Sequence, residues 1–212
     1  MAGYGEFVPS DPHGLGEGGT VPNAAAQVLV IFLHGSEDEA VPDMCIPKGK
    51  WSTTPAIISG VSGEVVKGKQ VVVFAHCTSV MPAVSSSSMI SPADTKVARR
   101  YQELGRVLGH FTNAGYLKEN IFIAGHSAGA WVALWGLAEH PTAFAGAIAF
   151  APAFAGKPGR PPGWDYLRKT AIDRFAKATV LPSLIYAFEN DEWEPVHALE
   201  QIFAALPGVS FV

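Results

Sequence analysis

Short, unbroken apolar runs alternate along this chain with segments that have the pattern of helices. Five runs of four to six apolar residues recur, and a weaker sixth lies near the last residue of the sequence. Strands with one solvated face would carry a polar residue at every second position, so unbroken runs indicate strands buried on both faces of a parallel sheet. We expect these strands at 28–33, 71–75, 121–124, 147–150, 184–188 and 209–212.

Helical segments lie between the strands. In the clearest, at 91–115, Ser91 and Pro92 have the pattern of a helix start and Gly115 that of a helix end. Apolar residues follow at spacings of four and three and form one stripe: Val97, Tyr101, Leu104, Leu108 and Phe111. We expect further helices at 128–139, 165–177 and 196–206, and one near 55–66 that two glycines interrupt.

This order of elements predicts a three-layer α/β/α sandwich with a mostly parallel sheet of about six strands. Right-handed crossovers place the C-terminal ends of all these strands along one edge, where a site is expected. We expect 27–212 to form one domain, preceded by a Gly- and Pro-rich surface tail at 1–26. The insertion at 151–179 is the one segment large enough to shape the rim of a pocket.

The composition excludes several classes of function. The chain has 15 Lys and Arg against 19 Asp and Glu, a net charge of −4, which argues against nucleic acid or an anionic membrane as the main partner. No apolar stretch reaches the roughly 18 residues of a membrane-spanning helix. The first residues lack the basic start and apolar stretch of a signal peptide. We therefore expect no membrane span and, by default, a cytoplasmic location.

The pentapeptide Gly125-His126-Ser127-Ala128-Gly129 lies between a predicted buried strand and a predicted helix. In that setting the G-x-S-x-G pattern is typical of a nucleophile elbow. The turn strains the backbone of the serine, and side chains two residues away on either side would collide, which explains both glycines. The helix that follows directs its N–H groups and dipole at the serine and would favour an oxyanion there. The alternative is an ordinary glycine-bracketed turn with an exposed serine.

With this elbow, 27–212 resembles the α/β-hydrolase superfamily, and more loosely its small, nearly lidless dienelactone-hydrolase-like members. A second shared motif, Phe32-Leu33-His34-Gly35-Ser36, is similar to the His-Gly turn after the first core strand of the superfamily. The resemblance implies an oxyanion hole made by the backbone N–H groups of Ser36 and Ala128. Dienelactone hydrolases carry cysteine where this chain has Ser127, which weakens the transfer of their lactone substrates.

The third shared motif is the acidic loop after the fifth strand, at 189–195. In it, Asp191 resembles the catalytic acid of the superfamily, which would orient a histidine and stabilise its imidazolium. Glu189, nearer the strand, is the second candidate, and a solvated acidic loop without a catalytic role is the third interpretation. Trp193 in the same loop is a candidate substrate contact, with core packing as the alternative.

The base departs from the superfamily pattern, which places the catalytic histidine in a loop after the last strand. The sequence has seven histidines, and His197 alone follows Asp191. A serine hydroxyl is a weak nucleophile without a base, so we expect that the chain is truncated and that its histidine lies beyond residue 212. His197, expected to begin a helix at the catalytic edge, and His76, at the end of the second strand, are the substitutes.

Two cysteines, Cys45 and Cys77, lack the spacing of zinc ligands, and we expect free thiols. In the superfamily the strands that precede them are neighbours, so the resemblance leaves a disulfide open, and with it export from the cell. The four serines at 85–88 have the composition of a flexible rim. Neither a metal nor an organic cofactor is implied.

Together these patterns predict a serine hydrolase that cleaves a carboxylic ester or related acyl bond of a small molecule through an acyl-enzyme. A peptidase or acyltransferase on the same fold would differ mainly in its pocket lining. If the chain is complete without a catalytic histidine, it is a non-catalytic binding protein. A chain truncated before its histidine would be inactive. The oligomeric state is left open.

Overall fold

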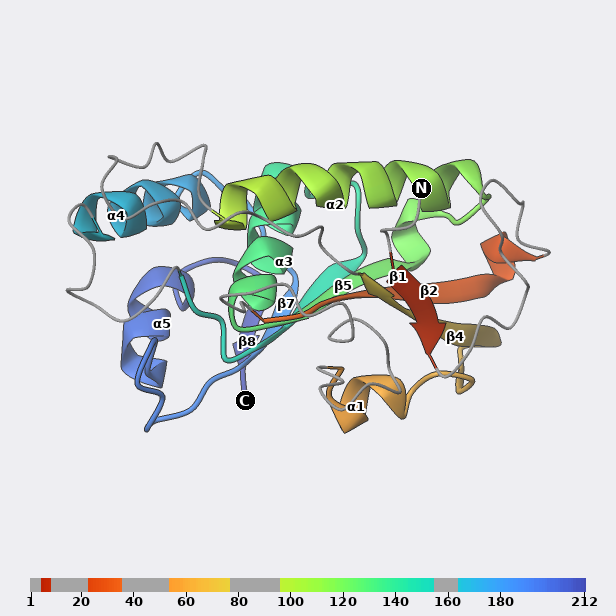
Figure 1. Cartoon of the computed structure of the whole chain (residues 1–212), viewed down its shortest axis with the longest axis horizontal. Helices are drawn as coiled ribbons and strands as arrows, with labels where there is room; N and C mark the ends of the chain where they lie inside the picture. Colours follow the sequence, from red (N-terminus) through yellow and green to blue (C-terminus); the bar gives the residue numbers. More distant parts are fainter. Residues whose placement is uncertain (1–4, 9–22, 36–53, 77–95, 155–163) are drawn as a thin grey trace.

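A single sheet with helices on both faces forms the molecule (Figure 1). The computed structural model describes residues 5–8, 23–35, 54–76, 96–154 and 164–212. Its eight strands run in the order β1-β4-β2-β5-β6-β7-β8, with β3 paired to β4. Six of them are mutually parallel, as the apolar runs predicted: β2 (Gln27–Leu33), β4 (Lys69–His76), β5 (Ile121–His126), β6 (Gly146–Phe150), β7 (Ser183–Tyr186) and β8 (Val209–Phe211).

Two antiparallel strands extend the sheet beyond this prediction. β1 (Gly5–Val8) pairs with β4, within the segment expected to be a tail without regular structure. The helix expected at 55–66 is wrong over most of its length: α1 (Ala56–Ser59) is a single turn, and β3 (Val65–Val66) follows it. Lys67 and Gly68, at φ of 50° and 75°, form the turn between β3 and β4, because two positive φ values match the twist of a tight hairpin.

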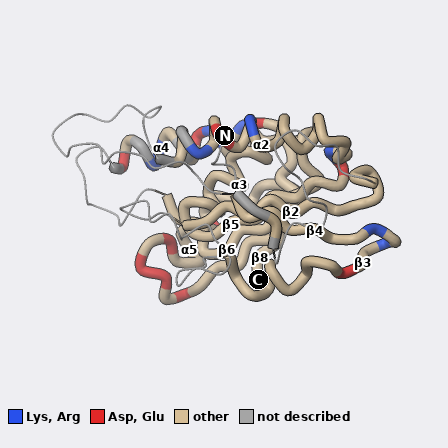
Figure 2. Tube along the Cα trace, turned by 45° about the vertical axis from the view of Figure 1, so that its right-hand side comes forward, with Lys and Arg blue, Asp and Glu red and all other residues tan. Residues whose placement is uncertain are grey.

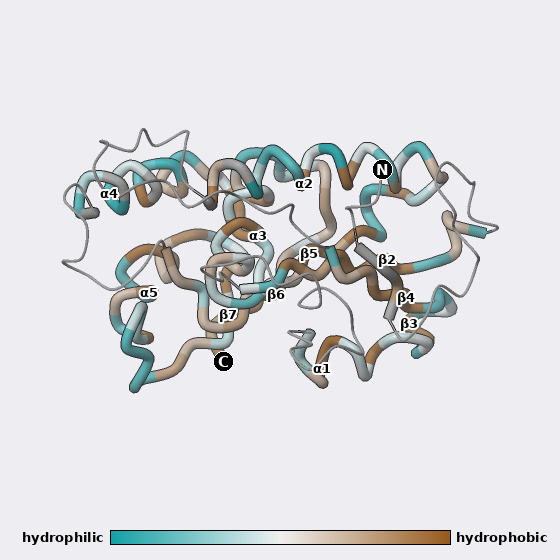
Figure 3. The backbone as a smooth tube through the Cα atoms, viewed as in Figure 1, coloured by the Kyte–Doolittle hydropathy of each residue, from teal (hydrophilic) through white to brown (hydrophobic). Residues whose placement is uncertain are grey.

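Four helices pack with one face of the sheet: α2 (Lys96–Asn113), α3 (Ala128–Glu139), α4 (Trp164–Phe175) and α5 (Val196–Phe203). The stripe predicted on α2 faces inward, with Val97, Leu104 and Phe111 buried, while its outer side is hydrophilic (Figure 3). Gly115 ends this segment at φ 103°, as a C-cap requires. On the opposite face, Ile58 of α1 packs on β2 and β4. Short 3-10 turns at Ala24–Ala26 and Lys118–Asn120 precede β2 and β5.

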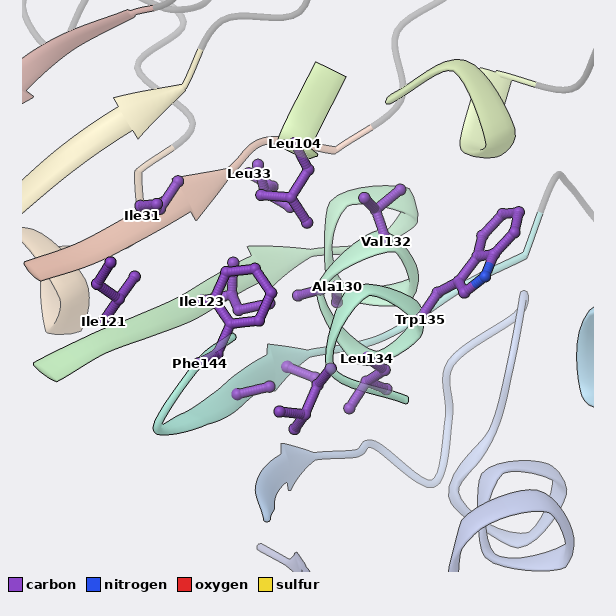
Figure 4. Packing of buried hydrophobic residues seen from close by; sticks show 14 of the residues in the cluster. Ile31, Leu33, Leu104, Ile121, Ile123, Ala130, Val132, Leu134, Trp135 and Phe144 are labelled. Atoms are coloured by element: carbon purple, nitrogen blue, oxygen red, sulfur yellow. The ribbon is translucent and has the colours of Figure 1, made fainter. Parts of the chain in front are cut away.

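α3 is the centre of the core. Ten consecutive residues of this helix, 128–137, are buried, as expected of a helix that is apolar on all sides. Figure 4 shows Ala130, Val132 and Leu134 packed among side chains of β2 and β5 and Leu104 of α2. Trp131 contacts three further rings, from the chain after β6, from α4 and from α5: Phe154, Phe175 and Phe203. The helix that begins at the elbow is therefore held on every side.

The register of the parallel strands brings three chain segments to one edge of the sheet. Gly125 is level with Leu33 at the end of β2, and His126 is level with Phe150, which pairs in turn with Tyr186. The His-Gly turn, the elbow and the acidic loop all leave the sheet here. Among the helices that the structure describes, none is long and apolar enough to cross a membrane.

Candidate active site

Ser127 occupies the strained position expected of an elbow. Its backbone has φ 53° and ψ −122°, a region that residues other than glycine rarely adopt and that costs about 1–3 kcal/mol. Three backbone hydrogen bonds fix it: its N–H donates to Phe150 O at 2.9 Å, and its carbonyl accepts from Trp131 N and Ala153 N at 3.1 and 3.2 Å. The sheet and α3 thus impose the strain on this residue.

The two glycines of the motif are both required by close backbone approach. A Cβ on Gly125 would overlap the backbone of Gly129 and Ala130, because α3 turns back across the end of β5. A Cβ on Gly129 would overlap the carbonyl oxygens of Leu33 and His34, because the first turn of α3 lies on the end of β2. No larger residue fits either position without moving a helix or a strand.

The serine is presented at the N-terminus of α3. Ser127 is the N-cap residue, but its hydroxyl does not cap the helix, and the residue is half-buried. Ala128 follows as the first helical residue, and its N–H belongs to the first turn, whose amides have no partner within a helix. The geometry supplies one backbone donor and the positive end of a helix dipole beside the hydroxyl.

The second predicted donor, Ser36, lies outside the described residues, but the residue before it is placed beside the serine. A Cβ on Gly35 would lie 3.1 Å from His126 Nδ1 and 3.5 Å from Ser127 Cβ. Gly35 of the His-Gly turn therefore lies beside the elbow. Cys45, Cys77 and the serines at 85–88 also lie outside the described residues.

A buried polar cluster lies behind this turn, and sequence reasoning missed it. Arg100 of α2, 5% exposed, donates from Nη2 to the carbonyl of His34. His34 Nδ1 donates to Gly35 O at 2.7 Å. His76 Nε2, at the end of β4, lies 3.8 Å from Glu103 Oε2 of α2. The signal in the sequence was weak: Arg100 follows Val97 by three residues, which puts an arginine on the apolar face of α2.

Burial controls the charge of this cluster. Burial, and secondarily the Arg100 charge, lowers the pKa of His34 to about 4, so its ring is neutral at pH 7. Burial also lowers the pKa of Arg100 to about 10, while Glu103 opposes that shift, so the guanidinium remains charged at pH 7. The neutral ring of His34 therefore donates to Gly35 O, while the charged Arg100 donates to the backbone carbonyl of His34.

Asp191 lies in the loop between β7 and α5 and organises it. Its Oδ1 accepts the backbone N–H groups of Trp193 at 2.7 Å and Glu194 at 3.2 Å, and its own N–H donates to Phe188 O at 3.3 Å. Asp191 is half-buried, whereas the second candidate, Glu189, is exposed. Acidic residues gather on this loop and on α5 (Figure 2).

Glu194, which the sequence did not single out, is the buried carboxylate of the loop. It is 2% exposed and accepts two hydrogen bonds from Arg168 of α4, Nε to Oε1 at 3.1 Å and Nη2 to Oε2 at 2.7 Å. This two-pronged ion pair ties the acidic loop to α4. Trp193 remains 39% exposed beside it.

The described histidines do not complete a triad. His197 is exposed on the first turn of α5, and His76 is buried beside Glu103. His126 is exposed at the end of β5, and His140 bonds Tyr101 Oη at 2.8 Å beyond the far end of α3. Within the part of the chain described here, no hydrogen bond joins Ser127 Oγ to a histidine, and no three His, Cys, Asp or Glu side chains gather as a metal site.

Comparison with solved structures finds esterases with the same fold. A phospholipase/carboxylesterase from Dyadobacter fermentans superposes over all of this chain and 88% of its own, with 18% identity and a TM-score of 0.57. Esterase 2 of Thermogutta terrifontis without ligand superposes over 89% of this chain and 72% of its own, with 16% identity and a TM-score of 0.52. Its butyrate-bound form gives the same coverage, 18% identity and a TM-score of 0.51.

Comparison of sequences gives the family. No curated protein matches the chain in sequence. The family described as "Serine aminopeptidase, S33" matches residues 83–198, more than half of the chain, including the elbow and the acidic loop. The parallel sheet, the covering helices and this match together place the chain among the hydrolases of the α/β-hydrolase superfamily. The chain belongs to the serine aminopeptidase S33 family.

Proposed function

We propose that this protein is a serine hydrolase that cleaves a carboxylic ester, or a related acyl bond, of a small molecule through an acyl-enzyme. One observation carries the proposal: Ser127 is held at φ 53° with a hydroxyl that does not cap α3, although it occupies the N-cap. Strain of this kind is kept where a reactive group must be presented. Ser127 Oγ attacks the carbonyl carbon, and the N–H groups of Ala128 and Ser36 receive the oxyanion.

Asp191 orients the catalytic histidine in this proposal. Two loop amides already hold Oδ1, which leaves Oδ2 for an imidazole N–H. The histidine takes the proton of Ser127 and returns it to the departing alkoxide, and water then releases the acid. Among the described histidines, His197 on the first turn of α5 is the candidate for this role, because it follows the acidic loop directly.

The substrate we propose is a small ester whose acyl part contacts the acidic loop. Trp193 and Phe188 are 39% and 56% exposed there and offer apolar surface at the edge that carries Ser127. The Thermogutta esterase 2 structures, one with bound butyrate and others phosphoramylated by tabun, phosphonylated by sarin or phosphorylated by paraoxon, support small acyl and phosphoryl ligands on this fold. We also propose a relation to the dienelactone-hydrolase-like branch. Its members are nearly lidless, and in this chain α4 is the one described helix between β6 and β7.

A p-nitrophenyl ester series from acetate to octanoate tests the proposal. The natural protein, expressed from its complete reading frame, is expected to hydrolyse the short esters with a burst of p-nitrophenol equal to the enzyme concentration, and S127A to lose both burst and turnover. A protein that releases p-nitrophenol equally well with S127A is not a Ser127 hydrolase.

A peptidase is the second candidate, because the family match is described as a serine aminopeptidase. Aminoacyl p-nitroanilides assayed beside the esters distinguish the two, since an aminopeptidase cleaves the anilides at the faster rate. Inertness toward both substrate classes would favour the third interpretation, a binding protein on a hydrolase fold.

A further inference from the structure

We propose that Arg100 is a positioning residue that holds the oxyanion-hole turn against the elbow. The proposal rests on the proposed serine hydrolase function and names a residue that holds the turn at His34 and Gly35, which precedes the proposed second oxyanion donor. It is carried by the hydrogen bond from Arg100 Nη2 to the carbonyl of His34, two residues before Ser36.

Arg100 is a cation at a buried position of α2. It is 5% exposed on the inner face of α2, next in the chain to the half-buried Tyr101 of the apolar stripe. Among the described residues, its Nε and Nη1 find no hydrogen-bond partner. An unsatisfied buried donor destabilises the folded protein, and an unbranched apolar side chain such as methionine would carry none of that penalty. A cation kept at such a position is expected to serve a purpose other than stability.

The bond that Arg100 does make falls on the backbone that matters for the oxyanion hole. The carbonyl oxygen of His34 accepts the hydrogen bond from the guanidinium and also lies where a Cβ on Gly129 would overlap it. The next residue, Gly35, lies beside Ser127, where an added Cβ would be 3.5 Å from Ser127 Cβ. The turn is therefore contacted both by α2 and by the first turn of α3.

The charge of Arg100 strengthens its hydrogen bond to the carbonyl of His34. A hydrogen bond from a cation to a carbonyl is about twice as strong as a neutral one, and low-dielectric surroundings strengthen it further. Glu103, one turn further along α2, and His76 beside it face the same region, and Glu103 helps to keep the guanidinium charged. His34 is neutral, so it does not compete with Arg100 as a second cation.

A small displacement of this turn is enough to impair catalysis. An oxyanion donor works only within about 2.7–3.1 Å of the developing charge, and a shift of 1 Å costs about 10²-fold in rate. Loss of the Arg100 bond would release the peptide that precedes the Ser36 N–H. The defect would appear in the transition state, where the oxyanion forms, and much less in ground-state binding.

The test compares R100M, R100K and R100A with R106M as the matched control, since Arg106 is an exposed arginine on the same helix. With a p-nitrophenyl ester, R100M is expected to lose about 10²-fold in kcat with KM changed by less than about 3-fold. R100K is expected to retain part of the activity through its charge. R106M is expected to keep wild-type kcat. Guanidinium chloride at millimolar concentration is expected to restore R100A, to leave R106M unchanged and not to restore an S127A/R100A double variant. An R100M with unchanged kcat, or with a loss confined to KM, would overturn the proposal.

A second readout needs no turnover and separates this proposal from the proposed function. Hydrogen exchange of the backbone amides at 34–36 is expected to be at least 10-fold faster in R100M than in wild type, with the amides of β5 unchanged. Equal exchange at 34–36 would overturn the proposal even in an inactive protein. If the wild type hydrolyses no ester and exchange at 34–36 is still faster in R100M than in wild type, the serine hydrolase function is contradicted and the role of Arg100 in holding the turn is supported.

Discussion

Gly129 lies against the carbonyl oxygen of His34, so closely that a Cβ on the glycine would overlap that oxygen. This contact joins the helix that presents Ser127 to the turn that precedes Ser36. The two motifs, about ninety residues apart in the sequence, thus contact each other in the structure.

The glycine requirement predicts a large loss of stability in G129A. The added methyl would meet two carbonyl oxygens of β2 and its turn, and overpacking of this kind costs about 3 kcal/mol or more. Urea unfolding measures it. G105A is the matched control, because a Cβ on Gly105 in α2 meets nothing within 4 Å, and alanine there is expected to stabilise the helix by about 0.5–1 kcal/mol. If G129A and G105A unfold at the same urea concentration, the close approach is wrong.

The Arg168–Glu194 pair predicts a second stability effect. Removing Arg168 leaves a carboxylate that is 2% exposed without its cation, which costs about 3–5 kcal/mol. R168M is therefore expected to be strongly destabilised in urea unfolding, and the double variant R168M/E194M less so.

The comparison pair lies on the same helix. Lys169 and Asp173 form an exposed i,i+4 pair, and K169M is expected to change the free energy of unfolding by about 0.5 kcal/mol or less. If R168M lowers the free energy of unfolding no more than K169M does, the burial of the Arg168–Glu194 pair adds nothing to stability, and the prediction is wrong.

The depressed pKa of His34 predicts how stability depends on pH. The folded protein binds a proton at His34 only near pH 4, whereas the unfolded chain does so near pH 6.5. The contribution of His34 is therefore complete above pH 6.5 and is lost as the pH falls toward 4, at up to about 1.4 kcal/mol per pH unit. The difference in unfolding free energy between wild type and H34Q, measured from pH 4 to 8, isolates this contribution. Parallel curves for the two proteins would contradict it.

The assignment of the acid predicts different losses for two neighbouring carboxylates. D191N keeps the oxygen that accepts the amides of Trp193 and Glu194 but loses the charge, so the loop keeps its shape while kcat falls about 10³–10⁴-fold. E189Q, on an exposed residue, is expected to keep kcat within about 3-fold. The measurement is kcat for ester hydrolysis by both variants. A larger loss in E189Q than in D191N would assign the catalytic acid to Glu189 instead.

The parallel core of the fold could be predicted from sequence because its strands are buried on both faces. Apolar residues follow one another without interruption in such strands, as in β2 and β5, and α3 is found at the predicted 128–139. β1 was missed because four residues within a Gly- and Pro-rich segment carry no period. β3 was missed because two valines pair only through a hairpin turn at Lys67 and Gly68.

The candidate site was predictable to the extent that backbone geometry dictates residue type. Gly125 and Gly129 are glycines because nothing larger fits, so the elbow could be found from letters and context alone. Arg100 and Glu194 could not be found in this way. An arginine on an amphipathic helix and one carboxylate among four in a loop look like surface residues, and only tertiary packing shows that both are buried.

The central claim is that Ser127 is the nucleophile, and covalent labelling tests it most directly. The natural protein, expressed from its complete reading frame, is treated with a fluorophosphonate and digested, and the adduct is located by tandem mass spectrometry. We expect one adduct per chain, on Ser127, and none in S127A. An adduct on another residue, such as one of the serines at 85–88, or no adduct under conditions that label a known serine esterase, would contradict the account.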